Sequence, residues 1–218
     1  RNPGEWTPNI YGTNENLDAL EFLKHLNSVI KERNPGLLLV AQENGLWPEL
    51  TDSVGNDHLG FDYKWSGGWT RDFLTYMETE PMRRNEHYDQ MTLSMMYAYS
   101  EHYVLTLGKR DVGTTAEFLE KLPGSLKQKV AQLRAAYGYL TLHPGIKMTA
   151  PDFDITPELK EYIHDLNEFY KTNPALYLMD GNSDGFEWIR FTNYDENIVA
   201  FLRKTEKPEE TLLAVCNF

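Results

Sequence analysis

The order of the predicted secondary structure constrains the fold of this chain more than any other feature. Short apolar runs that predict strands alternate with helical periodicities, and this strand–helix order occurs four times. The predicted strands cover residues 37–41, 59–65, 103–107 and 146–149. Strands joined by helices pair in parallel through crossover connections, so the order predicts an α/β fold built on a parallel sheet.

Helices are predicted where apolar residues recur three and four positions apart. They cover residues 14–32, 69–77 and 92–101, a stretch that begins after Ser125, and a stretch that begins after Thr156. Thr13 or Asn14 is expected to cap the first helix, and Asn34-Pro35-Gly36 to end it. Ser125 and Gln128 have the spacing of a capping box.

The apolar period changes to about two after Asn173-Pro174. Residues 186–191, 198–203 and 211–218 then predict strands separated by polar turns, which is typical of an antiparallel sheet. The sequence therefore predicts two domains. Residues 1–174 form a partial (β/α) barrel, and residues 175–218 begin an all-β domain.

Composition excludes several classes of partner. The formal net charge of −12 argues against nucleic acid and against anionic membranes, which both require a basic face. Among the apolar runs, none approaches the roughly 18 residues of a membrane span. The chain opens with Arg1 and shows no signal peptide. This start favours a cut inside a longer protein or a chosen boundary of the segment, and we expect the protein in the cytoplasm.

Residues for metal, cofactor or thiol chemistry are not arranged in useful patterns. The six histidines lack metal-ligand spacing, and the sequence has no glycine-rich phosphate loop. Cys216, the single cysteine, lies in an apolar run that predicts a buried thiol. We expect neither a metal nor a cofactor.

Several motifs occur along the chain in the order of one known family. They are GEWTPNIYG at 4–12, ENL at 15–17, EFL at 21–23, LGFDYKW at 59–65, GW at 68–69, HPG at 143–145, DLN at 165–167, GFEWI at 185–189 and VCNF at 215–218. In these motifs the chain resembles the glycogen (1,4-alpha-glucan) branching enzymes of the alpha-amylase-like superfamily. The resemblance implies the second half of a (β/α)8 TIM barrel, followed by the first strands of an antiparallel β-sandwich.

The resemblance also implies a function and partners. Branching enzymes transfer α-1,4 glucan segments to 6-hydroxyl groups, so the expected ligand is an α-glucan such as glycogen. Half a barrel leaves open sheet edges. We expect the missing half to come from the rest of the protein or from another chain.

The catalytic carboxylates of the family are missing or replaced. A retaining reaction needs two carboxyl groups about 5 Å apart, a nucleophile and an acid/base. The family nucleophile lies upstream of Gly4, outside this segment. Its acid/base is a Glu at the position held here by Gln42, and an amide cannot donate and regain a proton. Glu43 is the fallback acid, reachable only by a one-residue shift of the strand.

A third family motif, Ser-His-Asp-Glu-Val, is replaced by Gly-Lys-Arg-Asp-Val at 108–112. Lys109 stands where the family binds sugar hydroxyls with His, and Arg110 stands where it has the stabilising Asp. A guanidinium opposes the positive charge that develops on the sugar ring. Asp111 is displaced by one position, and the loop between Thr149 and Thr156 is shorter than in the family.

Aromatic residues predict sugar contacts near the barrel rim. Trp47, Trp65 and Trp69 could stack on glucose rings, and packing in the core is the alternative. Three functions follow. The first is a branching-enzyme-like protein that is inactive in this segment, the second is a non-catalytic glucan-binding or scaffold protein, and the third, less favoured, is an alpha-amylase-like hydrolase.

Overall fold

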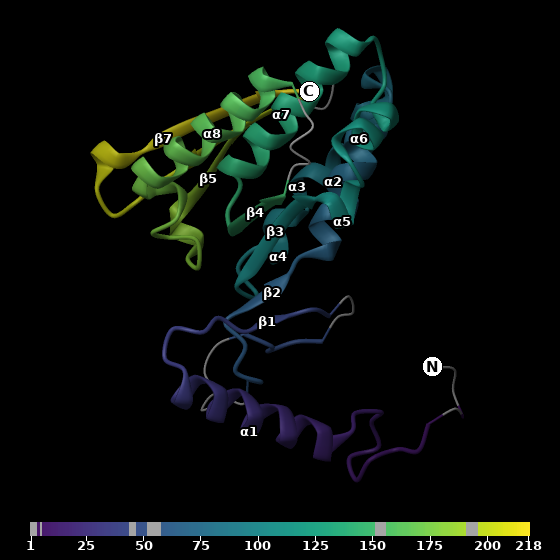
Figure 1. Cartoon of the computed structure of the whole chain (residues 1–218), viewed down its shortest axis with the longest axis vertical. Helices are drawn as coiled ribbons and strands as arrows, with labels where there is room; N and C mark the ends of the chain where they lie inside the picture. The colour runs from purple at the N-terminus through teal and green to yellow at the C-terminus, as the bar shows by residue number, and fades with distance from the viewer. Residues whose placement is uncertain (1–3, 5, 44–46, 52–57, 151–155, 191–195) are drawn as a thin grey trace. The chain divides into compact units, whose positions relative to one another are not determined.

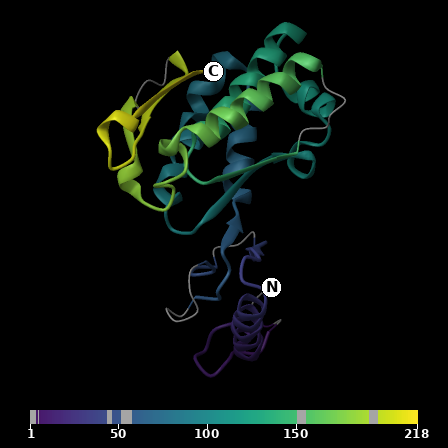
Figure 2. The same ribbon diagram turned by 60° about the vertical axis from the view of Figure 1, so that its left-hand side comes forward.

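The computed structural model describes residues 4, 6–43, 47–51, 58–150, 156–190 and 196–218. The chain forms two compact units, Arg1–Lys64 and Trp65–Phe218. Figure 1 labels helices and strands of both units where there is room, and Figure 2 gives a second view. The predicted 174/175 domain boundary remains a prediction.

In the first unit, helix α1 (Leu17–Arg33) precedes a short parallel pair of strands. Asn16 caps α1, because its side-chain oxygen accepts a hydrogen bond of 3.1 Å from the Ala19 N–H. The predicted caps, Thr13 and Asn14, were therefore wrong, whereas Asn34 ends the helix as expected.

Strand β1 (Val40–Ala41) is shorter than the predicted strand 37–41. The carboxylate of Asp62 accepts a hydrogen bond of 2.8 Å from the Leu39 N–H. This N–H therefore bonds to a side chain instead of to the backbone of a neighbouring strand. Leu38 is exposed, although a run that is apolar at every position is typical of a strand covered on both faces. Strand β2 (Tyr63–Trp65) pairs with β1 in the register Val40↔Tyr63 and Ala41↔Lys64.

The second unit opens with helix α2 (Gly67–Glu78) and the 3-10 turn η2 (Pro81–His87). Two short helices follow, α3 (Tyr88–Thr92) and α4 (Ser94–Tyr97), in place of the single helix predicted at 92–101. The chain then runs through β3 (Tyr103–Gly108), α5 (Lys109–Val112), α6 (Thr115–Lys121), α7 (Leu126–Leu142), β4 (Ile146–Ala150) and α8 (Pro157–Thr172).

Strands β3 and β4 pair in parallel from Val104↔Ile146 to Gly108↔Ala150. Helix α7 is the crossover between them, as the strand–helix order predicted. Its capping box is present, because Ser125 accepts from the Gln128 N–H and Gln128 accepts from the Ser125 N–H.

Two 3-10 turns, η3 (Pro174–Leu176) and η4 (Ser183–Gly185), lead to an antiparallel sheet. Its strands are β5 (Phe186–Arg190), β6 (Ile198–Arg203) and β7 (Leu212–Asn217), with a third turn, η6 (Pro208–Glu210), between the last two. Helices α7 and α8 run side by side, with β7 next to α7 (Figures 1 and 2).

One core fills the second unit. Phe73 of α2, Tyr139 of α7 and Phe201 of β6 are buried in it together with Ala214 of β7. The rings of Tyr139 and Phe201 meet edge to face, with centroids 6.2 Å apart. The antiparallel sheet thus packs on the helices of the same unit. Among the described residues, no helix is both long and apolar enough to cross a membrane.

Candidate functional site

Gln42 and Glu43 directly follow β1, at the carboxyl end of that strand. The Gln42 side chain is exposed and Glu43 is half-buried. The Glu43 carboxylate lies 3.2 Å from Nζ of Lys64, whose side chain is 8% exposed. The same ammonium donates a hydrogen bond of 3.1 Å to the carbonyl of Trp47.

This geometry gives Glu43 a structural contact. Lys64 is the register partner of Ala41 on the neighbouring strand, so its ammonium joins β2 to the residues that follow β1. Gln42 brings an amide, which carries no titratable proton. Acid/base catalysis needs a group that gives up and recovers a proton, and the Gln42 side chain cannot supply it.

The second stretch of interest follows β3. Asp111 turns back on the start of α5, because its Oδ2 accepts a hydrogen bond of 3.0 Å from the Gly108 N–H. The Arg110 side chain is exposed. The predicted contact of the Lys109 side chain lies outside the part of the chain that the structure describes, as does most of the loop between Thr149 and Thr156.

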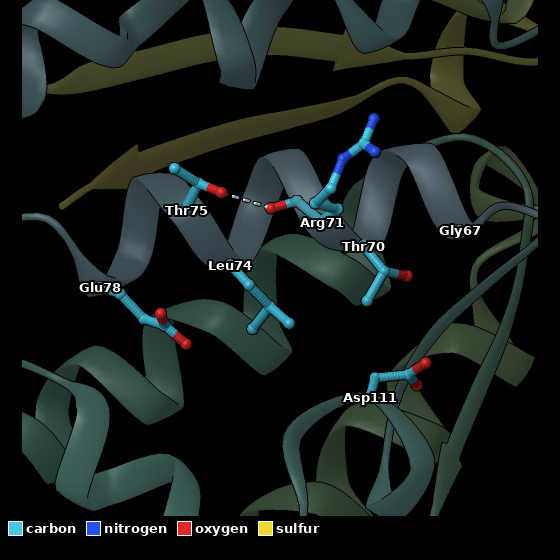
Figure 3. A pocket seen from close by; sticks show the side chains of 7 residues that line it. All are labelled: Gly67, Thr70, Arg71, Leu74, Thr75, Glu78 and Asp111. Atoms are coloured by element: carbon cyan, nitrogen blue, oxygen red, sulfur yellow. Dashed lines mark hydrogen bonds between the residues drawn. The ribbon is translucent and has the colours of Figure 1, made fainter.

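Asp111 lies at one end of a groove of about 360 Å³ along α2 (Figure 3). The groove is also lined by Gly67, Thr70, Arg71, Leu74, Thr75 and Glu78. Thr70 and Thr75 donate their hydroxyl protons to backbone carbonyls, Thr70 to Thr106 at 3.1 Å and Thr75 to Arg71 at 2.9 Å. Both hydroxyls are therefore engaged within the protein.

The two carboxylates of this groove do not form a retaining pair. Asp111 lies near Thr70, and Glu78 lies at the opposite end (Figure 3). Thr70 and Glu78 are eight residues apart on one helix, which corresponds to about 12 Å at the usual rise per residue. A retaining pair needs about 5 Å.

The three tryptophans differ in their surroundings. Trp69 is only 2% exposed and stacks on Phe73 and Tyr139, with centroids 5.0 and 6.5 Å away. Its rings thus pack in the core and present no face to a sugar. Trp65 is half-buried at the end of β2. Trp47 packs partly against the small core of the first unit and lines a groove there.

A buried charged cluster in the second unit was not anticipated. Asp180 pairs with Arg203 and lies 3.6 Å from Nζ of Lys147, and Arg203 also donates to the Leu142 carbonyl at 2.9 Å. Burial lowers the pKa of Lys147 to about 7. These residues lie far apart in the sequence, and no local motif marks them.

His143 lies beside this cluster. Its Nε2 is 3.0 Å from the Ser94 hydroxyl and its Nδ1 is 2.8 Å from the Pro144 carbonyl. Burial lowers the pKa of His143 to about 3, so the ring is neutral. Nδ1 then donates to Pro144, and Nε2 accepts from Ser94. The HPG motif marked this residue but not its contacts.

Comparison with curated proteins identifies close relatives over the whole chain. The 1,4-alpha-glucan branching enzyme GlgB 1 of Clostridium perfringens (strain 13) is 36% identical over 241 positions, which cover 100% of this chain and 36% of that protein. The GlgB enzymes of Halothermothrix orenii and Oceanobacillus iheyensis are 38% and 39% identical, covering 99% and 96% of this chain. The chain spans 36–38% of the length of these relatives. No protein-family model matches it.

Solved structures with the same fold belong to enzymes of the alpha-amylase kind. An Anoxybacillus alpha-amylase superposes with a TM-score of 0.64 at 16% identity, over 91% of this chain and 45% of that one. A debranching enzyme from Nostoc punctiforme gives 0.64 at 14% identity, over 90% and 44%. The predicted fold, part of a TIM barrel followed by the start of a β-sandwich, is confirmed.

Proposed function

Because the chain belongs to the 1,4-alpha-glucan branching enzyme family, of whose members it spans about a third, we propose that its ligand is an α-1,4-glucan such as glycogen. We propose further that this segment binds the glucan without transferring it. The missing half of the barrel comes from the rest of the protein or from another chain.

Gln42 is the observation that carries this proposal. Retaining transfer requires a carboxyl group that protonates the leaving oxygen and later recovers the proton. The amide of Gln42 stands at that place in the family order, and the neighbouring Glu43 is engaged by Lys64. After β3, Arg110 brings a cation to the position of the family's stabilising anion.

Two assays on the full-length protein test this function. In affinity electrophoresis, migration through a native gel that contains glycogen should be retarded relative to a gel without it. In an iodine-stain assay, the amylose–iodine signal should stay at the level of the protein-free control. Unretarded migration would contradict the proposed ligand, and a falling iodine signal with new branch points would contradict the proposed inactivity.

The alpha-amylase-like alternative is tested in the same reaction. A hydrolase lowers the iodine signal and releases reducing ends without forming branch points. We expect no reducing ends above the control, because hydrolysis with retention uses the same pair of carboxyl groups as transfer.

A further inference from the structure

The first unit contains a groove that no part of the proposed chemistry uses. Its volume is about 420 Å³, within the range of small-molecule sites. Tyr11 and Trp47 line it as aromatic residues, Leu20 and Leu59 supply apolar surface, and Lys24 is among its polar residues. All of these residues belong to the first unit.

The backbone around Tyr11 is held in place by hydrogen bonds of the turn that contains it. The side-chain oxygen of Asn9 accepts from the N–H groups of Tyr11 and Thr13 at 2.9 and 3.1 Å. The Asn9 amide donates to the Thr13 hydroxyl at 2.7 Å and to the Glu15 carbonyl at 3.1 Å. The Tyr11 side chain is nevertheless 75% exposed. A fixed backbone thus presents an aromatic ring that the fold itself does not bury.

The position of Trp47 is also fixed by contacts within the first unit. The Trp47 carbonyl accepts the hydrogen bond of the buried Lys64 ammonium, and the Trp47 side chain packs partly against the small core that contains Ala41, Leu50 and Leu59. Two residues on, Glu49 lines the groove with a φ of 59°, in the left-handed region that is unfavourable for glutamate. Backbone strain of this kind concentrates at binding sites.

The charged residues that line the groove favour a neutral ligand over an anionic one. Glu15 and Glu49 outnumber Lys24, so a phosphate or another anion would meet net repulsion. The hydrogen bond from Thr13 lowers the pKa of Glu15, which keeps this carboxylate ionised as an acceptor for hydroxyl groups. A sugar ring offers apolar C–H faces for aromatic rings and hydroxyl edges for the Glu15 carboxylate, whereas the Thr13 hydroxyl is already engaged by Asn9 and Glu15.

From these contacts we propose that the groove between Tyr11 and Trp47 is a subsite that binds a stretch of neutral glucan chain. The inference rests on the proposed function for the identity of the ligand. It goes further by naming residues that form the site, which lie on the 9–15 turn and at positions 47–49.

The test is a titration of the full-length protein with maltoheptaose. Tyr11→Ala should weaken binding about tenfold, the upper range for the loss of one aromatic partner. Phe22→Ala is the matched control, because Phe22 is an aromatic residue of the same unit that is 62% exposed and lies outside the groove. Trp47→Phe keeps an aromatic ring in the small core and should weaken binding less than Tyr11→Ala.

Hydrogen–deuterium exchange gives a local readout of the same binding. Maltoheptaose should slow exchange in the peptides that cover residues 9–15 and 47–51. If the wild type binds but Tyr11→Ala binds as tightly as Phe22→Ala and neither peptide is protected, the subsite is wrong and the glucan function stands. If the wild type does not bind at all, the proposed function itself fails.

Discussion

Lys64 holds two groups at once: its Nζ lies 3.2 Å from the Glu43 carboxylate and donates a hydrogen bond of 3.1 Å to the Trp47 carbonyl. The ammonium is almost fully buried, and it fixes the chain on both sides of residues 44–46. The residue expected as fallback acid and a wall of the proposed subsite therefore depend on one cation.

Replacing Lys64 should be more damaging than replacing its partner. Lys64→Met leaves Glu43 and the Trp47 carbonyl without this donor, and we expect the free energy of unfolding to fall by about 2–3 kcal/mol. Glu43→Gln retains a hydrogen-bond acceptor at a half-exposed position and should cost about 1 kcal/mol. Urea unfolding of both variants measures the difference. Equal losses would contradict the role assigned to Lys64.

Acid should destabilise the protein through His143. The pKa of the folded state, about 3, lies below the ordinary value of 6.5, because burial disfavours the imidazolium. The unfolded chain therefore takes up a proton that the folded chain refuses, and the free energy of unfolding decreases as pH falls from about 6.5 towards 3. His143→Gln should show a shallower decrease in urea unfolding between pH 7 and 5. An unchanged slope would contradict this account.

Mild alkali should stabilise the protein through Lys147. The Asp180 carboxylate lies against both Lys147 and Arg203, so it offsets only part of the effect of burial on the lysine. Burial lowers the pKa of Lys147 from 10.5 to about 7. Above pH 7 the unfolded state binds the extra proton, so the free energy of unfolding rises from pH 7 to 9.

Lys147→Met removes this titration and should flatten the rise. Urea unfolding at pH 7, 8 and 9 compares the variant with the wild type. A wild-type stability that stays level or falls across this window would contradict a neutral Lys147.

Relieving backbone strain at Glu49 should stabilise the fold. Glycine adopts a φ of 59° without the steric clash of a Cβ atom, so Glu49→Gly should raise the free energy of unfolding by about 1 kcal/mol. Asn197 also has a positive φ, 51°, but asparagine tolerates this region. Asn197→Gly is therefore the control and should show no gain, because it also removes the hydrogen bond from the Asn197 amide to the Pro81 carbonyl. Thermal unfolding ranks the two variants.

Much of the fold could be predicted because its signals are local. The Ser125–Gln128 capping box starts α7 where expected, and the period-two pattern located β6 and β7. The start of helix α6 also has a local sequence signal, although the sequence-based prediction does not include this helix. Thr114 and Glu117 form a second capping box of the same spacing.

Other departures arise from contacts between distant residues. The predicted helix 92–101 is divided at Leu93, near which the Met91 carbonyl accepts from the Tyr139 hydroxyl. Strand β1 is shortened by the side chain of Asp62. A single sequence does not show which distant side chain will compete for a backbone group.

The candidate site also combines features that the sequence indicates with contacts that it does not. The assignment of Gln42 and Arg110 to the family's catalytic positions rests on motif order and stays a prediction. The partner of Glu43 could not be predicted, because Lys64 lies 21 residues away in the sequence on the neighbouring strand. The core position of Trp69 was open between two alternatives until its stacking partners were known.

The most direct test of the central claim counts α-1,6 branch points in amylose after incubation with the full-length protein, by enzymatic debranching and chain-length analysis. The wild type, Gln42→Ala and Glu43→Gln should all give the branch count of the protein-free control, because the proposal assigns the position of the proton donor to the amide of Gln42. Branch points formed by the wild type and lost in Glu43→Gln would contradict the account and identify Glu43 as the acid.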